Sequence, residues 1–244
     1  MPHYSFNEKY FDVIDNEHKA YWMGFLWCDG YVGKRDRIGN GRSQLEYNLK
    51  FSLMESDRDH LGKFNKDING TYPVHIYKCS SGYLKQGEKT NECRLFITNL
   101  YFGELLQEKY GIIPDRYDCS KVINLIPEGL KKHFIRGVLD ADGSFCHYNI
   151  IEDGVDRDKF AVRFSTYEML LEFIESYLYK VGVTNTEHYK KYTRHAGKDG
   201  NCKALCLSGR QQLLKVLSYL YDDSTIYLDR KYEKYLKIKE DFGD

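Results

Sequence analysis

Two short apolar stretches interrupt the otherwise mixed pattern of hydrophobic and polar positions along the chain. The first covers residues 21–30 (YWMGFLWCDG), and the second covers residues 134–143 (FIRGVLDADG). In both, apolar residues lie all around a helix rather than along one stripe, which predicts a buried helix. Each stretch ends in an acid followed by glycine, Asp29-Gly30 and Asp142-Gly143, and glycine is a common stop for a helix.

The segments after each apolar helix alternate with the period of two that is typical of half-buried strands. In residues 44–52 the apolar series is Leu45, Tyr47, Leu49 and Phe51, with polar residues between them. Residues 159–165 repeat this pattern with Phe160, Val162 and Phe164. We expect further strands at 31–42, 71–79, 92–98, 143–150, 186–194 and 202–208, with an acidic turn at 152–158. Further helices are expected at 57–68, 99–110, 167–181, 211–221 and 228–240, and Asp15 is the expected N-cap of the first apolar helix.

The order of elements repeats, and so does the spacing. Asp29 and Asp142 are 113 residues apart, as are Ser52 and Ser165. The same offset at two independent places indicates a duplicated unit. We predict an α+β fold of two pseudo-symmetric αββαββα repeats, each a four-stranded antiparallel sheet with helices on one face. The boundaries we expect are 1–110 for the first repeat with its N-terminal arm, 111–126 for a connector, and 127–244 for the second repeat with an extra C-terminal helix. Pro127 is expected to open the second apolar helix.

Small residues spaced four apart predict that the two apolar helices pack closely against each other. Gly24 and Cys28 share one face of the first helix, and Gly137 and Ala141 share one face of the second. Close packing would bring the C-terminal ends together, and with them Asp29 and Asp142. Two carboxylates there would repel each other and face the negative ends of two helix dipoles. That arrangement makes sense if a divalent cation lies between them.

These decapeptides resemble the signature of the LAGLIDADG homing endonucleases, and the resemblance covers nearly the whole chain. The second copy follows the consensus through Gly-Val-Leu-Asp-Ala-Asp-Gly, whereas the first has Trp27 and Cys28 in place of Asp and Ala. The resemblance implies a monomer that binds a long, asymmetric duplex on a saddle of two sheets. It also implies hydrolysis of one phosphodiester bond in each strand across the minor groove, leaving short 3′ overhangs. Asp140 is expected to be structural, forming hydrogen bonds at the helix base.

The expected site follows from that resemblance and from the preferences of hard cations. Asp29 and Asp142 are the expected catalytic residues and metal ligands, and the carbonyls of Cys28 and Ala141 are additional candidate ligands. Mg²⁺ is the expected ion, and Mn²⁺ or Ca²⁺ is expected to occupy the same sites. The family usually adds Gln or Lys side chains that organise water. The matching positions here are Ser52 and Ser165 for Gln, and Thr98 and Ser208 for Lys, with Lys50 and Arg163 as nearby basic candidates. Hydroxyl groups are weaker at this task, which is the best sequence argument against full activity.

The polar sheet faces and their loops are the expected DNA interface. Arg and Lys suit guanine, Gln and Asn suit adenine, and loop cations suit phosphates. The set is Tyr31, Lys34, Arg35, Arg37, Arg42, Gln44, Glu46, Asn48, Lys50, His75, Tyr77, Lys85, Arg94, Ser144, His147, Arg163, His188, Lys190, Lys191, Tyr192, Arg194, Lys198 and Lys203. A solvated sheet face is the alternative for each member taken singly. The two halves differ at most of these positions, so two different half-sites are expected.

Composition and charge argue against several other classes of protein. The 244 residues are 42% hydrophobic with a formal net charge of +0, which favours a folded protein and argues against indiscriminate coating of nucleic acid. Seven scattered cysteines without a Cys-x-x-Cys pair indicate free thiols in a reducing compartment with access to DNA, not a zinc or redox site. We expect no secretion signal and no membrane partner. Met1 and the Gly-Asp end favour a complete reading frame over an intein core. Two alternatives stay open: an RNA maturase acting on its host intron RNA, and a DNA-binding protein that has lost cleavage.

Overall fold

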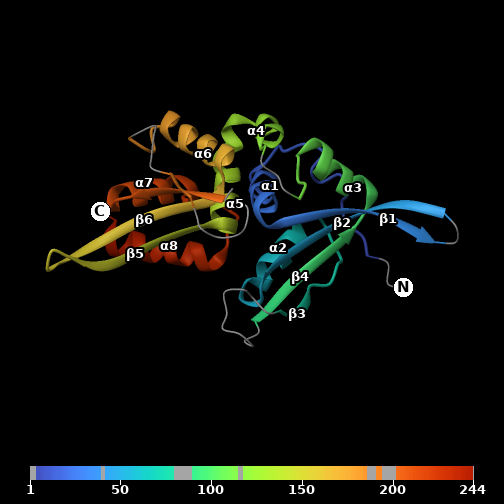
Figure 1. Cartoon of the computed structure of the whole chain (residues 1–244), viewed down its shortest axis with the longest axis horizontal. Coiled ribbons are helices and arrows are strands. Elements are labelled where there is room, and N and C mark those ends of the chain that lie inside the picture. The colour runs from blue at the N-terminus through green and yellow to red at the C-terminus, as the bar shows by residue number, and fades with distance from the viewer. Residues whose placement is uncertain are drawn as a thin grey trace.

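The computed structural model describes residues 4–39, 42–79, 90–114, 118–185, 191–193 and 202–243, and it contains the predicted duplication (Figure 1). The first repeat runs α1 (Glu17–Asp29), β1 (Gly30–Gly39), β2 (Arg42–Met54), α2 (Arg58–Asp67), β3 (His75–Cys79), β4 (Thr90–Thr98) and α3 (Leu100–Glu104). The second runs α5 (Lys131–Asp142), β5 (Gly143–Glu152), β6 (Val155–Tyr167), α6 (Glu168–Lys180), β7 (Lys191–Thr193), β8 (Cys202–Ser208) and α7 (Arg210–Tyr221). Helix α4 (Ser120–Leu125) lies between the repeats, and α8 (Asp229–Phe242) follows the second.

The two sheets have equivalent topology. Their strand orders are β1-β2-β4-β3 and β5-β6-β8-β7, and all pairings are antiparallel. Gly30 pairs with Phe51 in the first sheet and Gly143 pairs with Phe164 in the second, so the registers also differ by the 113-residue offset. The predicted α+β class and the two four-stranded antiparallel sheets are therefore confirmed.

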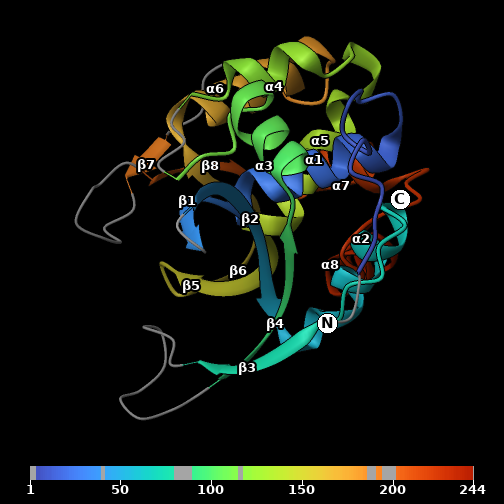
Figure 2. The ribbon, with the colours of Figure 1, turned by 90° about the vertical axis from the view of Figure 1, so that its right-hand side faces the viewer.

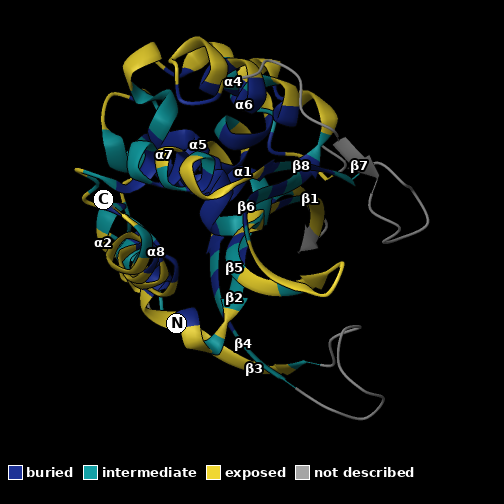
Figure 3. Cartoon of the chain, turned by 90° about the vertical axis from the view of Figure 1, so that its left-hand side faces the viewer, coloured by how far each residue is buried: buried dark blue, intermediate teal, exposed yellow. Residues whose placement is uncertain are grey.

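The helices cover one side of both sheets, and the strands curve around an open space on the other side (Figure 2). The predicted alternation holds in β2, where Tyr47, Leu49 and Phe51 are buried under the helices and the residues between them are at least partly accessible. Helices α1 and α5 lie between the two sheets, and burial is concentrated there (Figures 1 and 3). Within the described ranges, no helix is both long enough and apolar enough to cross a bilayer.

Several boundaries differ from the sequence-based expectation. Asn16, not Asp15, caps α1, because its side chain accepts a hydrogen bond from the backbone N–H of Lys19 at 3.0 Å. The expected acidic turn at 152–158 is wrong, since β5 and β6 extend to a two-residue turn at Asp153-Gly154. Both of these residues have a positive φ, as a type I′ hairpin requires, and both faces of the extension are exposed, so it carries no apolar alternation.

Two further differences concern connections. The expected connector, 111–126, contains α4, which is too short to show a helical period. Pro127 precedes a 3₁₀ turn, Glu128–Leu130, and α5 begins only at Lys131. Strand β3 begins at His75 rather than at residue 71.

Candidate functional site

Two glycines allow α1 and α5 to pack closely. A Cβ atom on Gly24 would lie 2.1 Å from the carbonyl oxygen of Phe134, and one on Gly137 would lie 2.1 Å from the carbonyl oxygen of Tyr21. Both obstacles are backbone atoms of the opposite helix, so only glycine fits at either position. The predicted close approach of the two helices is confirmed, and it fixes where their C-terminal ends lie.

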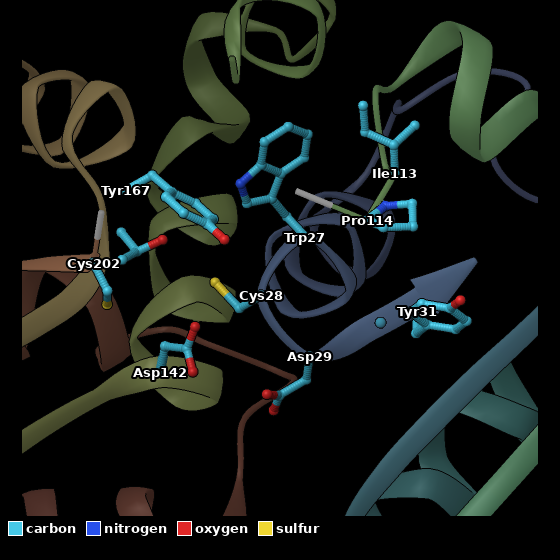
Figure 4. Close-up of a pocket in the computed structure, with 11 residues that line it drawn as sticks. Trp27, Cys28, Asp29, Tyr31, Ile113, Pro114, Asp142, Tyr167 and Cys202 are labelled. Atoms are coloured by element: carbon cyan, nitrogen blue, oxygen red, sulfur yellow. The ribbon is translucent and has the colours of Figure 1, made fainter. Parts of the chain in front are cut away.

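The helix ends meet at a cleft of about 370 Å³ that contains both motif acids. Asp29 ends α1 and Asp142 ends α5, and Figure 4 shows their carboxyl groups near each other at the neighbouring helix ends. The cleft is also lined by residues that the sequence did not single out for it. These are Trp27, Gly30, Ile113, Pro114, Thr166, Tyr167 and Cys202, together with the expected Cys28 and Tyr31.

Asp140 has the structural role expected of it. Its carboxylate is almost fully buried and accepts hydrogen bonds from the Tyr21 hydroxyl at 2.8 Å and the Tyr221 hydroxyl at 2.5 Å. It also accepts one from the backbone N–H of Leu228 at 2.8 Å. Burial raises the pKa of Asp140, and the nearby Lys231 and the three donors oppose that shift. In the first repeat Trp27 occupies the matching position and has no carboxylate with which to form the equivalent network.

The open face of the first sheet gathers most of the DNA-binding candidates of that repeat. Lys50 lies over the ring of Tyr31 at 5.7 Å, and Arg94 over the ring of Tyr77 at 4.7 Å. Around Lys50 is a second hollow, of about 380 Å³, lined by Tyr31, Gly33, Lys34, Arg35, Asn48, Lys50 and Phe96. This face therefore combines cations, an amide and aromatic rings, which are suitable groups for base edges and phosphates.

Glu46 holds two of the expected cations on this face in place. It accepts hydrogen bonds from Arg35 at 2.9 Å and from Arg37 at 3.1 Å, and these guanidinium groups lower the pKa of the Glu46 carboxyl. His75 lies opposite Arg94 in the pairing of β3 with β4, so it shares this face. Gln44 lies opposite Arg37 in the pairing of β1 with β2.

Three of the expected DNA contacts have their polar groups on the helix side of the sheets instead. Lys34 borders the second hollow, but its ammonium lies 5.4 Å from the centre of the buried Tyr47 ring. His147 stacks on Phe160 and packs against Phe242 of α8. Lys203 forms an ion pair with Glu168 of α6 at 2.5 Å. Successive residues of a strand point to opposite faces of the sheet. When all of them are polar, this alternation does not tell which of the two faces the helices cover.

The remaining DNA-binding candidates divide into described and undescribed positions. Ser144 and Arg163 pair directly between β5 and β6. Lys85, His188, Lys190, Arg194 and Lys198 lie outside the described residues, as do the side chains of Arg42, Lys191 and Tyr192.

The supporting candidates lie on equivalent strands of the two sheets, and none of them is among the residues that line the cleft. Among the described residues, the buried Ser52 Oγ and the buried Arg163 Nε have no hydrogen-bond partner in the protein. Unsatisfied buried polar atoms are uncommon, and two of the four among the described residues are at positions selected from sequence, the others being on His60 and Asn65. Thr98 donates to the Asn48 side chain at 2.5 Å, and Ser208 lies opposite Ala161 in the matching register of the second sheet. Ser165 pairs with Ala204 and is half-buried.

Lys231 is a charged residue near the site that sequence analysis missed. It is 6% exposed, and its ammonium donates to backbone carbonyls at the end of α5. Nothing distinguishes it in sequence, because it is one of many lysines in a charged helix. The cleft residues Tyr167 and Cys202 were also missed, since they come from the ends of β6 and β8 and reach the site only through the fold.

Comparison with solved structures identifies the fold. The chain is similar to the LAGLIDADG homing endonuclease I-GzeII in complex with its DNA target, with 12% identity and a TM-score of 0.60 over 93% of this chain and 89% of that one. It is similar to the LAGLIDADG meganuclease I-CpaMI bound to uncleaved DNA, with 10% identity and a TM-score of 0.60 over 93% and 90% of the two chains. It is also similar to I-LtrWI bound to target DNA, with 12% identity and a TM-score of 0.59 over 93% and 90%.

Sequence comparison alone gives no such link, since no protein-family model and no curated protein matches the chain. The coverage of nearly both full lengths shows that the likeness includes both repeats and the helix pair between them. The chain therefore has the fold of the LAGLIDADG homing endonucleases.

Proposed function

We propose that this protein is a site-specific, double-strand DNA endonuclease that hydrolyses one phosphodiester bond in each strand. The observation that carries the proposal is the convergence of Asp29 and Asp142 in one cleft, at the ends of two helices packed through Gly24 and Gly137. Both acids lie at the negative ends of helix dipoles, a placement that is unfavourable for a carboxylate and that a bound cation would offset.

The residues of the cleft fit a hard divalent cation such as Mg²⁺. Within the described part of the chain, no cluster of three or more His, Cys, Asp or Glu side chains could hold a metal by itself. Mg²⁺ is typically held by one or two carboxylates and completes its shell with water and substrate phosphates. Asp29 and Asp142 would supply the carboxylates, and the carbonyls of Cys28 and Ala141 are further oxygen donors at the helix ends. Mn²⁺ and Ca²⁺ prefer the same donors.

The protein side chains would then position the duplex and its scissile phosphates. When bound, the cation supplies an activated water and relief of charge on the leaving oxygen. Arg163 in the second repeat has a buried Nε–H that no protein group satisfies, and its guanidinium would donate to a phosphate. In the first repeat, the buried hydroxyl of Ser52 also has no hydrogen-bond partner in the protein, and it would orient water or a phosphate oxygen. Cleavage across the minor groove would leave short 3′ overhangs, as the resemblance implies.

The two sheets of a single monomer would recognise two different half-sites of the target. Lys50 in the first sheet corresponds by the 113-residue offset to Arg163 in the second, and Asn48 corresponds to Ala161. Because an amide and an alanine cannot read the same base edge, the duplex target should be asymmetric. All seven cysteines lie in the described ranges, and none of them forms a disulfide. Free thiols fit a reducing compartment with access to DNA. An intron-encoded role in homing would suit such a nuclease.

The test is selection of cleaved sequences from a randomised duplex library in Mg²⁺. The wild-type protein should enrich a single long site and cut both strands, and EDTA should stop cleavage. Asp142→Asn and Asp29→Asn should bind the enriched duplex with affinity close to wild type and fail to cut it. The matched control is Asp241→Asn at the exposed end of α8, which should cut normally. An Asp142→Asn protein that cuts both strands at the wild-type rate would refute the assignment.

A DNA-binding protein without cleavage is the second candidate. It is favoured by the weak groups at the water-organising positions, where Ser52, Ser165, Thr98 and Ser208 replace Gln and Lys. In the library experiment this candidate predicts enrichment by binding and no cut product at any Mg²⁺ or Mn²⁺ concentration.

A further inference from the structure

Lys231 is bonded to the backbone on both sides of Asp142. Its Nζ donates to the carbonyl oxygens of Leu139 at 2.6 Å, Asp140 at 2.7 Å and Gly143 at 2.7 Å. These acceptors span the last turn of α5 and the first residue of β5. An ammonium has three N–H donors, and all three are used here. The last carbonyls of a helix lack partners inside it. In α5 the Leu139 carbonyl also accepts the backbone N–H of Gly143, and Lys231 adds a donor to it and to the Asp140 carbonyl.

The helix that carries Lys231 is itself fastened to the other repeat. Arg230 donates from Nε to both carboxylate oxygens of Asp57 at 3.0 Å, and Lys63 of α2 donates to Asp229 at 2.5 Å. Helix α8 therefore ties the first repeat to the end of α5. These contacts help to keep the lysine next to the carbonyls to which it donates.

The charge environment agrees with this placement. Burial lowers the pKa of Lys231 to about 8, and the nearby carboxylates of Asp140, Asp29 and Asp142 oppose the shift. The lysine is therefore mainly protonated at pH 7, and it is electrostatically linked to both motif acids. A cation at the C-terminal end of a helix also offsets the negative end of its dipole.

The first repeat has a different residue at the corresponding position. The 113-residue offset places Asp118 at the position that corresponds to Lys231, and Asp118 accepts a hydrogen bond from the backbone N–H of Ser120 in the α4 segment. The repeat relation therefore supplies no second lysine equivalent to Lys231 for the end of α1 at Asp29.

We infer that Lys231 is a positioning residue of the α5 active-site end, which fixes the backbone that carries Asp142 and leaves Asp29 to other contacts. The expected effect on cleavage rests on the proposed nuclease function. The expected effect on the backbone of residues 140–144 rests on the hydrogen bonds alone. Loss of the ammonium should loosen residues 140–144 selectively and slow the cut that depends on Asp142 more than the other cut. A misplacement of about 1 Å in a catalytic group can cost about 100-fold in rate.

The experiment compares Lys231→Met and Lys231→Gln with Lys237→Met, which removes an exposed lysine from the same helix. Hydrogen exchange measured by mass spectrometry reports the ends of α5 and α1 separately, without DNA or metal. Lys231→Met should speed exchange in residues 140–144 by at least tenfold with little change in residues 27–31. Lys231→Gln keeps two donors without the charge, folds more readily, and should show a smaller change of the same kind.

Cleavage of a supercoiled plasmid carrying the selected site gives the second readout. Lys231→Met should accumulate nicked circles, because one strand is cut at least tenfold more slowly, whereas wild type and Lys237→Met should give linear product. Equal acceleration of exchange at both helix ends, or equal slowing of both cuts, would overturn the inference and leave Lys231 as a general stabilising residue. If the wild type does not cut, the proposed function fails, and the exchange comparison still decides the role of Lys231.

Discussion

Substitution of Gly24 by alanine tests whether the close contact of α1 and α5 creates the site. The added Cβ would lie 2.1 Å from the Phe134 carbonyl oxygen, whereas ordinary contact begins at 3.4 Å. The helices would have to separate by about 1 Å, because both atoms belong to backbones that cannot rotate away. Overpacking of this kind costs about 1–3 kcal/mol, and the helix propensity of alanine returns up to about 1 kcal/mol.

The net effect of Gly24→Ala should be a loss of about 1–2 kcal/mol of unfolding free energy, with a fall in Tm of several degrees. Gly62→Ala is the matched control, because Gly62 lies inside α2 and is exposed, and a Cβ atom added to it would meet no atom within 4 Å outside the backbone of its own helix. It should stabilise the protein by about 0.5–1 kcal/mol. Urea denaturation monitored by tryptophan fluorescence and circular dichroism measures both changes.

Cleavage is the decisive readout for Gly24→Ala, since a shift of about 1 Å between Asp29 and Asp142 should lower the rate by about 100-fold. The assay is run well below the Tm, so that the protein is folded, and DNA binding is measured in parallel. Affinity should stay within a few-fold of wild type because the sheet faces are remote from Gly24. A Gly24→Ala protein with wild-type stability and wild-type cleavage would refute the argument that this contact positions the acids.

Three further substitutions test other parts of the account. Asp140→Asn should lose about 2–4 kcal/mol in urea denaturation, because the amide would place a donor against the Tyr21 and Tyr221 hydroxyls and the Leu228 N–H. Unchanged stability would contradict the network. His60→Phe should flatten the pH dependence of stability, because burial lowers the pKa of His60 to about 3. The stability that the neutral imidazole contributes is present above pH 6.5 and is lost as the pH falls toward 3. At pH 5 the wild type should have lost about 2 kcal/mol of unfolding free energy through this group. Equal wild-type and variant losses between pH 7 and pH 5 would contradict this. Arg163→Met should weaken binding or relax base preference in the second half-site while leaving the first unchanged, as measured by competition binding across single-base variants of the target.

The duplication and the helix pair were predictable because each rests on a simple repeat in the sequence. The offset between Asp29 and Asp142 fixed the equivalent positions, and Gly24 and Gly137 indicated a close helix contact that the backbone distances confirm. The role of Asp140 followed from its place two residues before the terminal acid, which directs it to another side of the helix.

Features that depend on packing between distant segments were not predictable. Lys231 reaches the end of α5 only because α8 folds back across both repeats, and a lysine in a charged helix gives no sign of that. His147 and Lys34 were assigned to the wrong side because polar strands lack the apolar marker that identifies the covered face. The extended β5–β6 hairpin was missed for the same reason, since exposed strands carry no alternation.

The most direct test of the central claim is a crystal structure of the protein with its selected duplex in Ca²⁺, an ion that occupies such oxygen sites. The account predicts calcium density about 2.3–2.6 Å from carboxylate oxygens of Asp29 and Asp142 and from the scissile phosphates, with the duplex against the open faces of both sheets. Calcium bound elsewhere, or a duplex lying on the helix side, would contradict it.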